Sequence, residues 1–281
     1  MEDHGFDVID CHHHYEAGAG IGDMLGYASR GAHDVDGVDM EMQTRIEIMD
    51  REHIRGAVII AGHSYLRPRG LADTMEVNNK VAAYRDRAPD RFVAAVGVVE
   101  PLYGHSGHDE IRRCAAELGM KGISFHNGYQ GVPIDGPLMY PMIEKIGEAG
   151  MTPFIHAIGT QLETVWQADV LAKDFPDLPM IVLDTFHDHN AVRALTDIAE
   201  RRPNLYFDLS LLVSFDCLGR PLVRAIGADR FVYGTDLYSW PLQTKSYGNI
   251  LSNILESDLS TEEKSAILSG NIKKILKLQL A

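Results

Sequence analysis

The chain has 281 residues, a formal net charge of −14 and 45% hydrophobic side chains. This length and composition allow one large buried core, and single α/β barrels often have this size. The acidic balance and the absence of a basic run in the sequence argue against nucleic acid or an anionic membrane as a partner.

No apolar run approaches the roughly 18 residues that a membrane span needs, and no N-terminal stretch has the sections of a signal peptide. The cysteines are odd in number and lie far apart, at Cys11, Cys114 and Cys217. This spacing does not suggest disulfides or a cysteine-based zinc site. We therefore expect a cytoplasmic protein.

Short apolar runs rich in β-branched residues recur along the chain, and each is followed by a polar loop and a stretch of helical periodicity. Eight such runs predict strands at residues 6–11, 56–61, 92–99, 122–125, 152–155, 180–183, 205–209 and 230–234. The periodicity predicts helices over residues 42–52, 75–88, 109–117, 140–149, 160–174, 191–201 and 218–226, with a final pair at 247–255 and 261–278.

Eight nearly continuous apolar strands that alternate with helices predict a parallel sheet covered by helices. The most economical closure is a (β/α)8 TIM barrel that forms a single domain over residues 1–281. An open doubly wound sheet is the alternative, but no G-x-G-x-x-G loop follows the first strand. The glycine-rich stretch 16–39 fits either a lid over the barrel mouth or a flexible surface excursion.

Three consecutive histidines directly follow the first apolar run, in the sequence Asp10-Cys11-His12-His13-His14. Alternate side chains of a strand share a face, so His12 and His14 should point the same way and His13 the opposite way. Neutral imidazoles are good ligands for zinc and related divalent metals. The cluster therefore predicts a metal site rather than the remnant of a purification tag.

The carboxyl ends of all strands in a barrel open onto one face, so residues that follow different strands meet there. The polar residues in these places are His12, His14, His63, His126, His156, Asp184, His187 and Asp236. His156 is predicted as a third metal ligand, and Asp236 is assigned a chemical role rather than a helix cap. His126 and His187 either act directly or orient ligands by hydrogen bonds, whereas His63 and His189 are assigned structural roles.

Several motifs, in matching order and spacing, resemble the amidohydrolase superfamily and its amidohydrolase-related branch, also called amidohydrolase 2. The resemblance covers nearly the whole chain and includes the opening I-D-x-H-x-H. The motifs are I-D-C-H-H-H at 9–14, P-D-R-F at 89–92, E-L-G-M-K-G-I at 117–123, Y-P-M at 140–142, P-F-I-H at 153–156, Y-G-T-D at 233–236 and G-N-I at 270–272.

The resemblance implies one divalent metal ion, most often zinc and in some members manganese. Its ligands would be His12, His14, His156 and Asp236. The chain departs from the family at two places. It lacks a bridging lysine at the end of strand four, which argues against a two-metal centre, and strand six is followed by Asp-Thr-Phe-His instead of a histidine and glycine. His187 comes two residues later than the family's strand-six histidine.

The resemblance implies hydrolysis of a small carboxylate, lactone or amide by a metal-activated water. Asp236 would accept the proton of that water, and His187 would polarise the carbonyl or protonate the leaving group. The alternative is a non-oxidative decarboxylase, a carbon–carbon lyase of a small aromatic or dienoic carboxylate, in which Asp236 or His187 protonates the carbon. A catalytically silent binding barrel is a third hypothesis, which the presence of all four candidate ligands disfavours.

Three further residues are candidates for substrate binding. His126 follows strand four, and Arg67 and Arg69 lie in the loop after strand two. Arginine binds carboxylates through two parallel hydrogen bonds, which suits a carboxylate substrate, although both arginines are also compatible with an ordinary solvated loop. The family resemblance further implies a possible homodimer.

Overall fold

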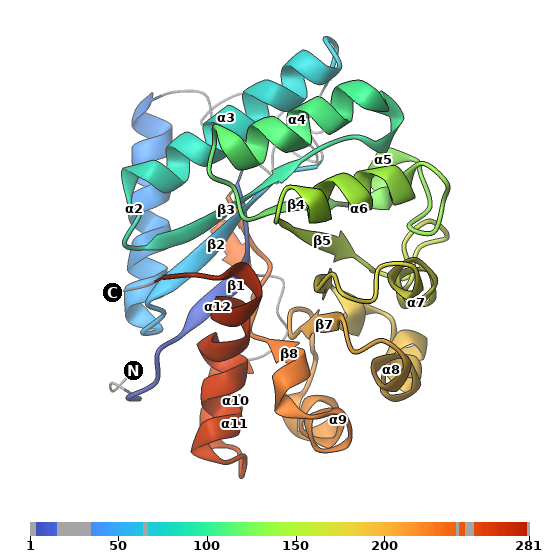
Figure 1. The fold of residues 1–281 in the computed structure, drawn as a ribbon. Helices are drawn as coiled ribbons and strands as arrows, with labels where there is room; N and C mark the ends of the chain where they lie inside the picture. The colour runs from blue at the N-terminus through green and yellow to red at the C-terminus, as the bar shows by residue number, and fades with distance from the viewer. Residues whose placement is uncertain (1–3, 16–34, 64–66, 240–241, 245–249, 280–281) are drawn as a thin grey trace.

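The computed structural model describes residues 4–15, 35–63, 67–239, 242–244 and 250–279. All eight predicted strands are present (Figure 1). They are β1 (Ile9–Tyr15), β2 (Gly56–Ala61), β3 (Phe92–Val98), β4 (Gly122–Phe125), β5 (Thr152–His156), β6 (Met180–Leu183), β7 (Leu205–Asp208) and β8 (Phe231–Val232). The first strand begins three residues later than predicted and continues through the three histidines to Tyr15. All of its side chains are buried.

The strands pair in chain order, and each of β1 to β7 is parallel to the strand that follows. The ends of the sheet are joined where the Cys11 N–H donates to the Tyr233 carbonyl at 2.9 Å. Beside this bond, the backbone N–H and the hydroxyl of Thr235 donate to the Asp10 carboxylate at 3.1 and 2.6 Å. The predicted (β/α)8 barrel is confirmed.

A short hairpin follows the eighth strand, made of β9 (Leu237–Ser239) and the antiparallel β10 (Leu242–Thr244). Leu237 pairs with His13 of β1 in parallel register. This pairing extends the sheet beyond β1 and places the residue before β9, Asp236, beside the first strand.

Helices surround the strands on the outside of the barrel, as Figure 1 shows. They are α2 (Val35–Arg51), α3 (Leu71–Arg87), α4 (His105–Ala116), α5 (Asn127–Gln130), α6 (Met139–Glu148), α7 (Val165–Lys173), α8 (His189–Arg201), α9 (Arg220–Ile226), α10 (Ile250–Glu256), α11 (Thr261–Ser265) and α12 (Asn271–Leu276). Across the part of the chain that the structure describes, no helix is both long and apolar enough to cross a membrane.

Several helices begin earlier than predicted, at residues 35, 71 and 105 instead of 42, 75 and 109. Two other differences have identifiable reasons. The predicted helix 160–174 begins only at Val165, because Thr164 and Gln167 form a capping box at its start. The predicted helix 261–278 is divided by a π-turn at Ala266–Gly270. The stretch predicted as a lid or excursion lies outside the described residues up to residue 34, and α2 begins at residue 35.

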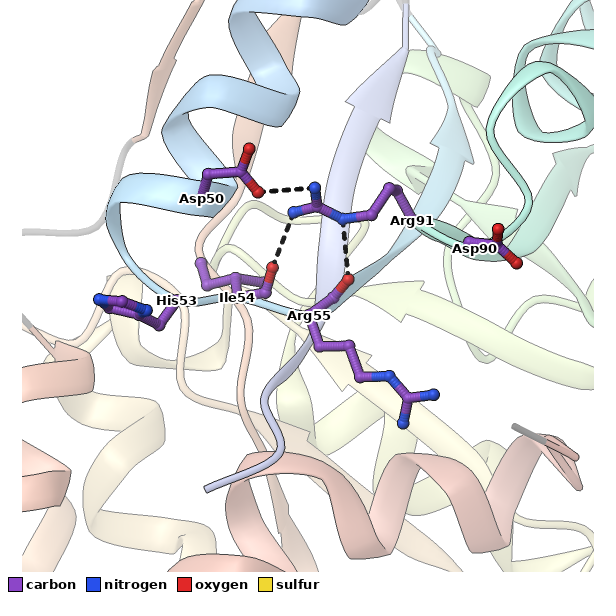
Figure 2. A pocket seen from close by; sticks show the side chains of 6 residues that line it. All are labelled: Asp50, His53, Ile54, Arg55, Asp90 and Arg91. Carbon is purple, nitrogen blue, oxygen red and sulfur yellow. Dashed lines mark hydrogen bonds and ion pairs between the residues drawn. The ribbon is translucent and has the colours of Figure 1, made fainter. Parts of the chain in front are cut away.

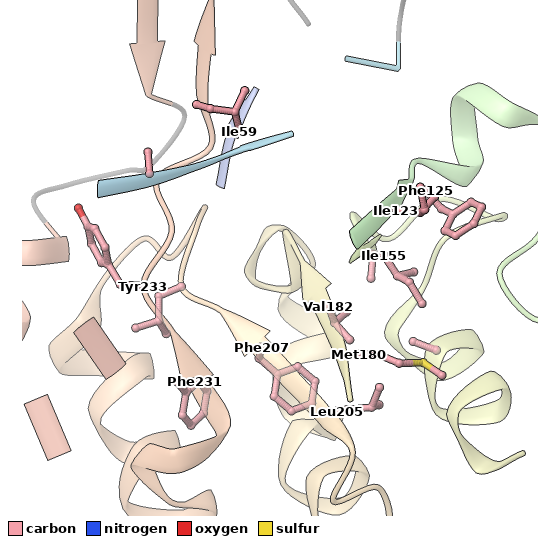
Figure 3. Close-up of a cluster of buried hydrophobic side chains, with 14 of the residues drawn as sticks. Ile59, Ile123, Phe125, Ile155, Met180, Val182, Leu205, Phe207, Phe231 and Tyr233 are labelled. Atoms are coloured by element: carbon pink, nitrogen blue, oxygen red, sulfur yellow. The ribbon is translucent and has the colours of Figure 1, made fainter. Parts of the chain in front are cut away.

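The strands are buried on both faces, as a barrel requires. The outward side chains pack beneath the helices in the cluster of Figure 3, which includes Phe125, Ile155 and Phe207. The alternate side chains, such as Phe154 and Ile181, fill the interior of the barrel. Apolar side chains of α12 belong to this second cluster, so the last helix contributes to the barrel interior.

A shallow hollow at the amino ends of β2 and β3 is lined by Asp50, His53, Ile54, Arg55, Asp90 and Arg91 (Figure 2). Its polar groups bind one another: Arg91 donates to the Asp50 carboxylate at 2.6 Å and to the carbonyls of Ile54 and Arg55 at 3.1 and 3.0 Å. The amino ends of barrel strands contribute mainly to stability. The functional site is therefore sought at the opposite end.

Candidate metal centre

The histidines of β1 alternate as the sequence predicts. His12 and His14 are buried and point to one side, with their Nε2 atoms 2.9 Å apart. His13 points to the other side, where its Nε2 lies 3.0 Å from the Asp10 carboxylate. Two imidazole nitrogens thus converge at the carboxyl end of the first strand.

His156 brings a third imidazole to the same place from the end of β5. Its Nε2 lies 3.3 Å from that of His14. Its Nδ1 donates to the Phe125 carbonyl at 2.9 Å, because a carbonyl can only accept. This bond fixes the tautomer and directs the Nε2 lone pair toward the other two histidines.

Asp236 completes the set of predicted ligands. It is 1% exposed, and one of its carboxylate oxygens lies 3.4 Å from the Nε2 atoms of both His12 and His14. Its backbone has φ of 55°, a left-handed conformation that turns the chain from β8 into the β9 hairpin. The structure therefore brings together all four residues that the sequence indicates as metal ligands.

Asp208, at the end of β7, holds His12 from behind. Its carboxylate lies 2.8 Å from His12 Nδ1, and its other oxygen accepts the backbone N–H of Asp184 at 3.0 Å. Gly234 makes this approach possible, because a Cβ atom there would lie 2.9 Å from the Asp208 carboxylate and 3.0 Å from His12 Cβ. The glycine of the Y-G-T-D motif is thus required by packing.

Burial and the neighbouring carboxylates set the electrostatics of the cluster. Burial lowers the pKa values of His14 and His156 well below their usual range. Burial also opposes the charge of His12, but Asp236, Asp184 and Asp208 outweigh it and raise the pKa of His12 to about 10. The cluster therefore favours a positive charge at the point that the imidazoles share.

These donors fit a divalent metal ion. Two ligands that lie about 2.0–2.2 Å from one ion at tetrahedral angles are roughly 3.3–3.6 Å apart. The neighbouring donor atoms of His12, His14, His156 and Asp236 are 2.9 to 3.4 Å apart. Imidazole and carboxylate suit zinc, manganese and related ions.

A histidine–glutamate pair stands beside the centre. The His126 ring stacks on that of His156, with centroids 4.7 Å apart and planes at 16°. Its Nδ1 lies 2.8 Å from a carboxylate oxygen of the fully buried Glu163, which also accepts the Gly128 N–H at 2.8 Å. The capping box that delays α7 leaves Glu163 in the loop after β5, within reach of His126.

His63, to which the sequence assigns a structural role, lies next to the same centre. Its ring is edge-on to that of His156, with centroids 5.4 Å apart. Its Nε2 lies 3.0 Å from the hydroxyl of Ser124 in β4. The ring therefore forms part of the wall of the site.

The two candidate arginines are placed differently. Arg67 forms an ion pair with the buried Glu100 and donates to the His63 carbonyl at 3.2 Å, so it lies near the centre. Arg69 binds Asp73 and Glu76, and its side chain is 63% exposed. Arg69 is therefore held at the surface.

His187 is not brought into the cluster. It ends the short 3₁₀ turn Thr185–His187, is exposed, and has its Nδ1 3.1 Å from the Ile158 carbonyl. The residue directly after β6 is instead Asp184, which is buried. Its Oδ2 lies 4.0 Å from His156 Nε2, and its Oδ1 lies 3.9 Å from His12 Nδ1, on the side of that ring that faces Asp208. The strand-six residue that faces the centre is thus a carboxylate.

Two residues of the site were not identified from the sequence. Asp208 offered a usable signal, because a carboxylate inside an otherwise apolar strand end is unusual in a buried sheet. Glu163 offered none, since its stretch is predicted as helix and only the capping box places it in a loop. Distance along the chain conceals both contacts, which span 196 and 37 residues.

A closed parallel barrel with imidazoles and carboxylates at the carboxyl ends of its strands defines a (β/α)8-barrel enzyme. A family model described as amidohydrolase matches residues 9–278. The chain belongs to this amidohydrolase family.

Known proteins extend this comparison. The 2-amino-3-carboxymuconate-6-semialdehyde decarboxylase of Dictyostelium discoideum is 23% identical to this chain, over 87% of this chain and 79% of that protein. The 5-carboxyvanillate decarboxylase of Sphingomonas paucimobilis has a TM-score of 0.72 at 17% identity, covering 98% and 100% of the two chains. That of Novosphingobium aromaticivorans, complexed with manganese and 4-hydroxy-3-methoxy-5-nitrobenzoic acid, has a TM-score of 0.73 at 18% identity, covering 99% and 98%.

Proposed function

We propose that this protein is a metal-dependent, non-oxidative decarboxylase of a small aromatic or dienoic carboxylate. The observation that carries the proposal is the similarity of 87% of the chain to a decarboxylase of a carboxymuconate semialdehyde. The shared fold of two carboxyvanillate decarboxylases is consistent with it. Hydrolysis, which the sequence favours first, has less support, because these relatives are named for the loss of a carboxyl group.

We propose His12, His14, His156 and Asp236 as the ligands of one divalent metal ion. Asp208 orients His12, as described above. When bound, the ion would hold substrate oxygens and draw electron density from them. Zinc and manganese both suit the ligand set, and the manganese in one related structure supports testing that metal alongside zinc.

The reaction requires one proton at carbon. The bond between the substrate carbon and its carboxyl group breaks, the electron pair stays on that carbon, carbon dioxide leaves, and the carbon takes a proton. The sequence suggests Asp236 or His187 as the donor. Because Asp236 is assigned to the metal and His187 binds the Ile158 carbonyl, we propose His126 instead: Glu163 engages its Nδ1, which leaves Nε2 for the substrate.

Substrate binding is proposed at His126 and Arg67. The Arg67 guanidinium reaches the His63 carbonyl beside the centre, and its partner Glu100 holds it in place. A contact between substrate and Arg69 would require breaking its bonds to Asp73 and Glu76. The cytoplasmic location and the homodimer stay predictions, since the structure describes a single chain.

The experiment is an assay of the purified protein loaded with manganese or zinc. It is incubated with a panel of small hydroxybenzoates and dienoic carboxylates, and products are identified by mass. We expect loss of carbon dioxide with the wild-type protein and no turnover with the His12→Ala/His14→Ala double variant. A product that has gained one water would refute decarboxylation and support the hydrolase.

A further inference from the structure

Asp184 is a buried carboxylate that the proposed ligand set does not use. It follows β6 and is 3% exposed. Its backbone is left-handed, with φ of 60° and ψ of 13°. A residue with a Cβ atom adopts this conformation at a cost, and it persists only where the surroundings hold it.

Two hydrogen bonds hold Asp184 in this conformation. Its backbone N–H donates to the Asp208 carboxylate, and the hydroxyl of Ser210 donates to Asp184 Oδ1, both at 3.0 Å. Because Oδ1 is engaged by Ser210, the orientation of the second oxygen, Oδ2, is also set. The carboxylate is therefore preorganised before any ligand arrives.

The position of Oδ2 matches that of a metal ligand. It lies 4.0 Å from His156 Nε2. Two ligands that lie about 2.1 Å from one ion and nearly opposite each other are roughly 4.0–4.2 Å apart. The nearer donors, which are 2.9 to 3.4 Å apart, correspond to neighbouring positions around the same ion. Asp184 thus fits a position across from His156.

The charge at the centre supports the same assignment. A buried carboxylate is costly unless a positive charge compensates it. Within the described residues, Asp184 approaches His156 at Nε2 and His12 at Nδ1, and both imidazoles must be neutral to bind a metal. Oδ2 of Asp184 lies on the Nε2 side of His156, and an oxygen of Asp236 lies on the Nε2 side of His12 and His14. A divalent cation among these nitrogens would compensate both carboxylates.

We propose that Asp184 is a fifth protein ligand of the metal ion and that it biases the centre toward manganese. Zinc in proteins is satisfied by four ligands, whereas manganese favours oxygen donors and higher coordination numbers. The inference rests on the metal centre of the proposed function. It goes beyond that proposal because it assigns the strand-six carboxylate and predicts a metal preference.

The test compares metal binding by the wild-type protein, Asp184→Asn and Glu110→Gln. Glu110 is a buried carboxylate in α4 that binds Asn78 and Arg113, so it controls for the loss of a buried charge elsewhere. Metal-free proteins are titrated with Mn²⁺ alone and with Zn²⁺ alone by calorimetry. Electron paramagnetic resonance then reports the environment of the bound Mn²⁺.

We expect Asp184→Asn to weaken Mn²⁺ binding at least about 10-fold and Zn²⁺ binding less than about 3-fold, with an altered Mn²⁺ spectrum. Glu110→Gln should leave both affinities unchanged. If Asp184→Asn does not fold, Ser210→Ala retains the carboxylate but releases its anchor, and a selective loss of Mn²⁺ affinity is still expected.

Equal weakening for both ions would overturn the preference for manganese, and an unaltered Mn²⁺ spectrum would overturn the ligand role, because the carboxylate would then act only through its charge. Unchanged Mn²⁺ binding by Asp184→Asn would overturn it as well. A wild-type protein that binds neither ion would overturn the metal centre itself, whereas release of carbon dioxide is measured separately and tests the proposed reaction.

Discussion

Each proposed imidazole ligand has two nitrogens, and at His12 and His156 the protein uses them differently. Nδ1 of His12 faces Asp208, Nδ1 of His156 donates to a backbone carbonyl, and both Nε2 atoms face the shared point. Such outer partners fix the tautomer and increase the basicity of the ligand. The arrangement therefore assigns Asp208 a role in metal affinity, although Asp208 contacts His12 and not the proposed ion.

The variant Asp208→Asn tests this role. The amide keeps the size of the side chain but loses its charge, so we expect metal affinity to fall about 10- to 100-fold. Competition with a chromophoric chelator measures the change. The control is Asp169→Asn, because Asp169 binds Arg201 and Arg202 at the surface of α7. An unchanged affinity in Asp208→Asn would mean that packing alone orients His12.

At this scale the sequence indicates the proposed ligands more clearly than the residues that support them. His12, His14, His156 and Asp236 each lie at or after the carboxyl end of a strand, and the barrel geometry brings such places together. The expected role of His187 depends on the conformation of a short turn, which local residues do not determine. The supports depend on contacts between distant segments, which no local pattern reveals.

At the scale of elements, close contacts between neighbouring strands limit what the sequence can contain. Gly122 begins β4, where a Cβ atom would lie 2.5 Å from the Thr152 carbonyl and 2.8 Å from the Phe154 ring. These are backbone and core atoms of β5, which cannot move without opening the sheet. We expect glycine to be needed here for space rather than for conformational freedom.

The substitution Gly122→Ala should lower the free energy of unfolding by about 1–3 kcal/mol, because it overpacks the interface of β4 and β5. Urea denaturation measures the change. Gly147→Ala in α6 is the matched control, since its Cβ atom would lie 3.4 Å from Leu178, at ordinary contact distance. Alanine favours a helix, so this variant should gain up to about 1 kcal/mol. Equal effects at both sites would contradict the packing argument.

The positions of the strands were predictable because apolar runs of strand length recur regularly between helical stretches. Their ends were less predictable. The first strand extends through the histidines to Tyr15. Its polar side chains can be buried because they have partners inside the protein, as His13 has in the Asp10 carboxylate. The π-turn that divides the last predicted helix leaves no mark in the apolar pattern.

At the scale of the whole molecule, the centre joins strands from opposite sides of the barrel. His12 and His14 come from β1, His156 from β5 and Asp208 from β7. An ion bound by the folded chain and not by the unfolded chain stabilises the fold. Metal binding should therefore stabilise the entire barrel and not one loop.

The prediction is a thermal shift. At a free metal concentration of about 100 times the dissociation constant, the gain is about 2.7 kcal/mol, which corresponds to a rise in Tm of roughly 5 °C for a domain of this size. Differential scanning calorimetry with manganese, zinc or a chelator measures it. The His12→Ala/His14→Ala variant should show no shift; a similar shift in that variant would place the bound ion elsewhere.

Asp184 and Asp236 share a backbone conformation, with φ of 60° and 55°. Glycine would adopt it without strain, at a saving of about 1–3 kcal/mol per residue, and would also remove a buried negative charge. Directed evolution for heat resistance in the presence of a chelator would therefore be drawn to these two codons, and it would return sturdier proteins that lack two of the carboxylates proposed to hold the ion. A screen for robust variants of this barrel needs metal retention as a second criterion.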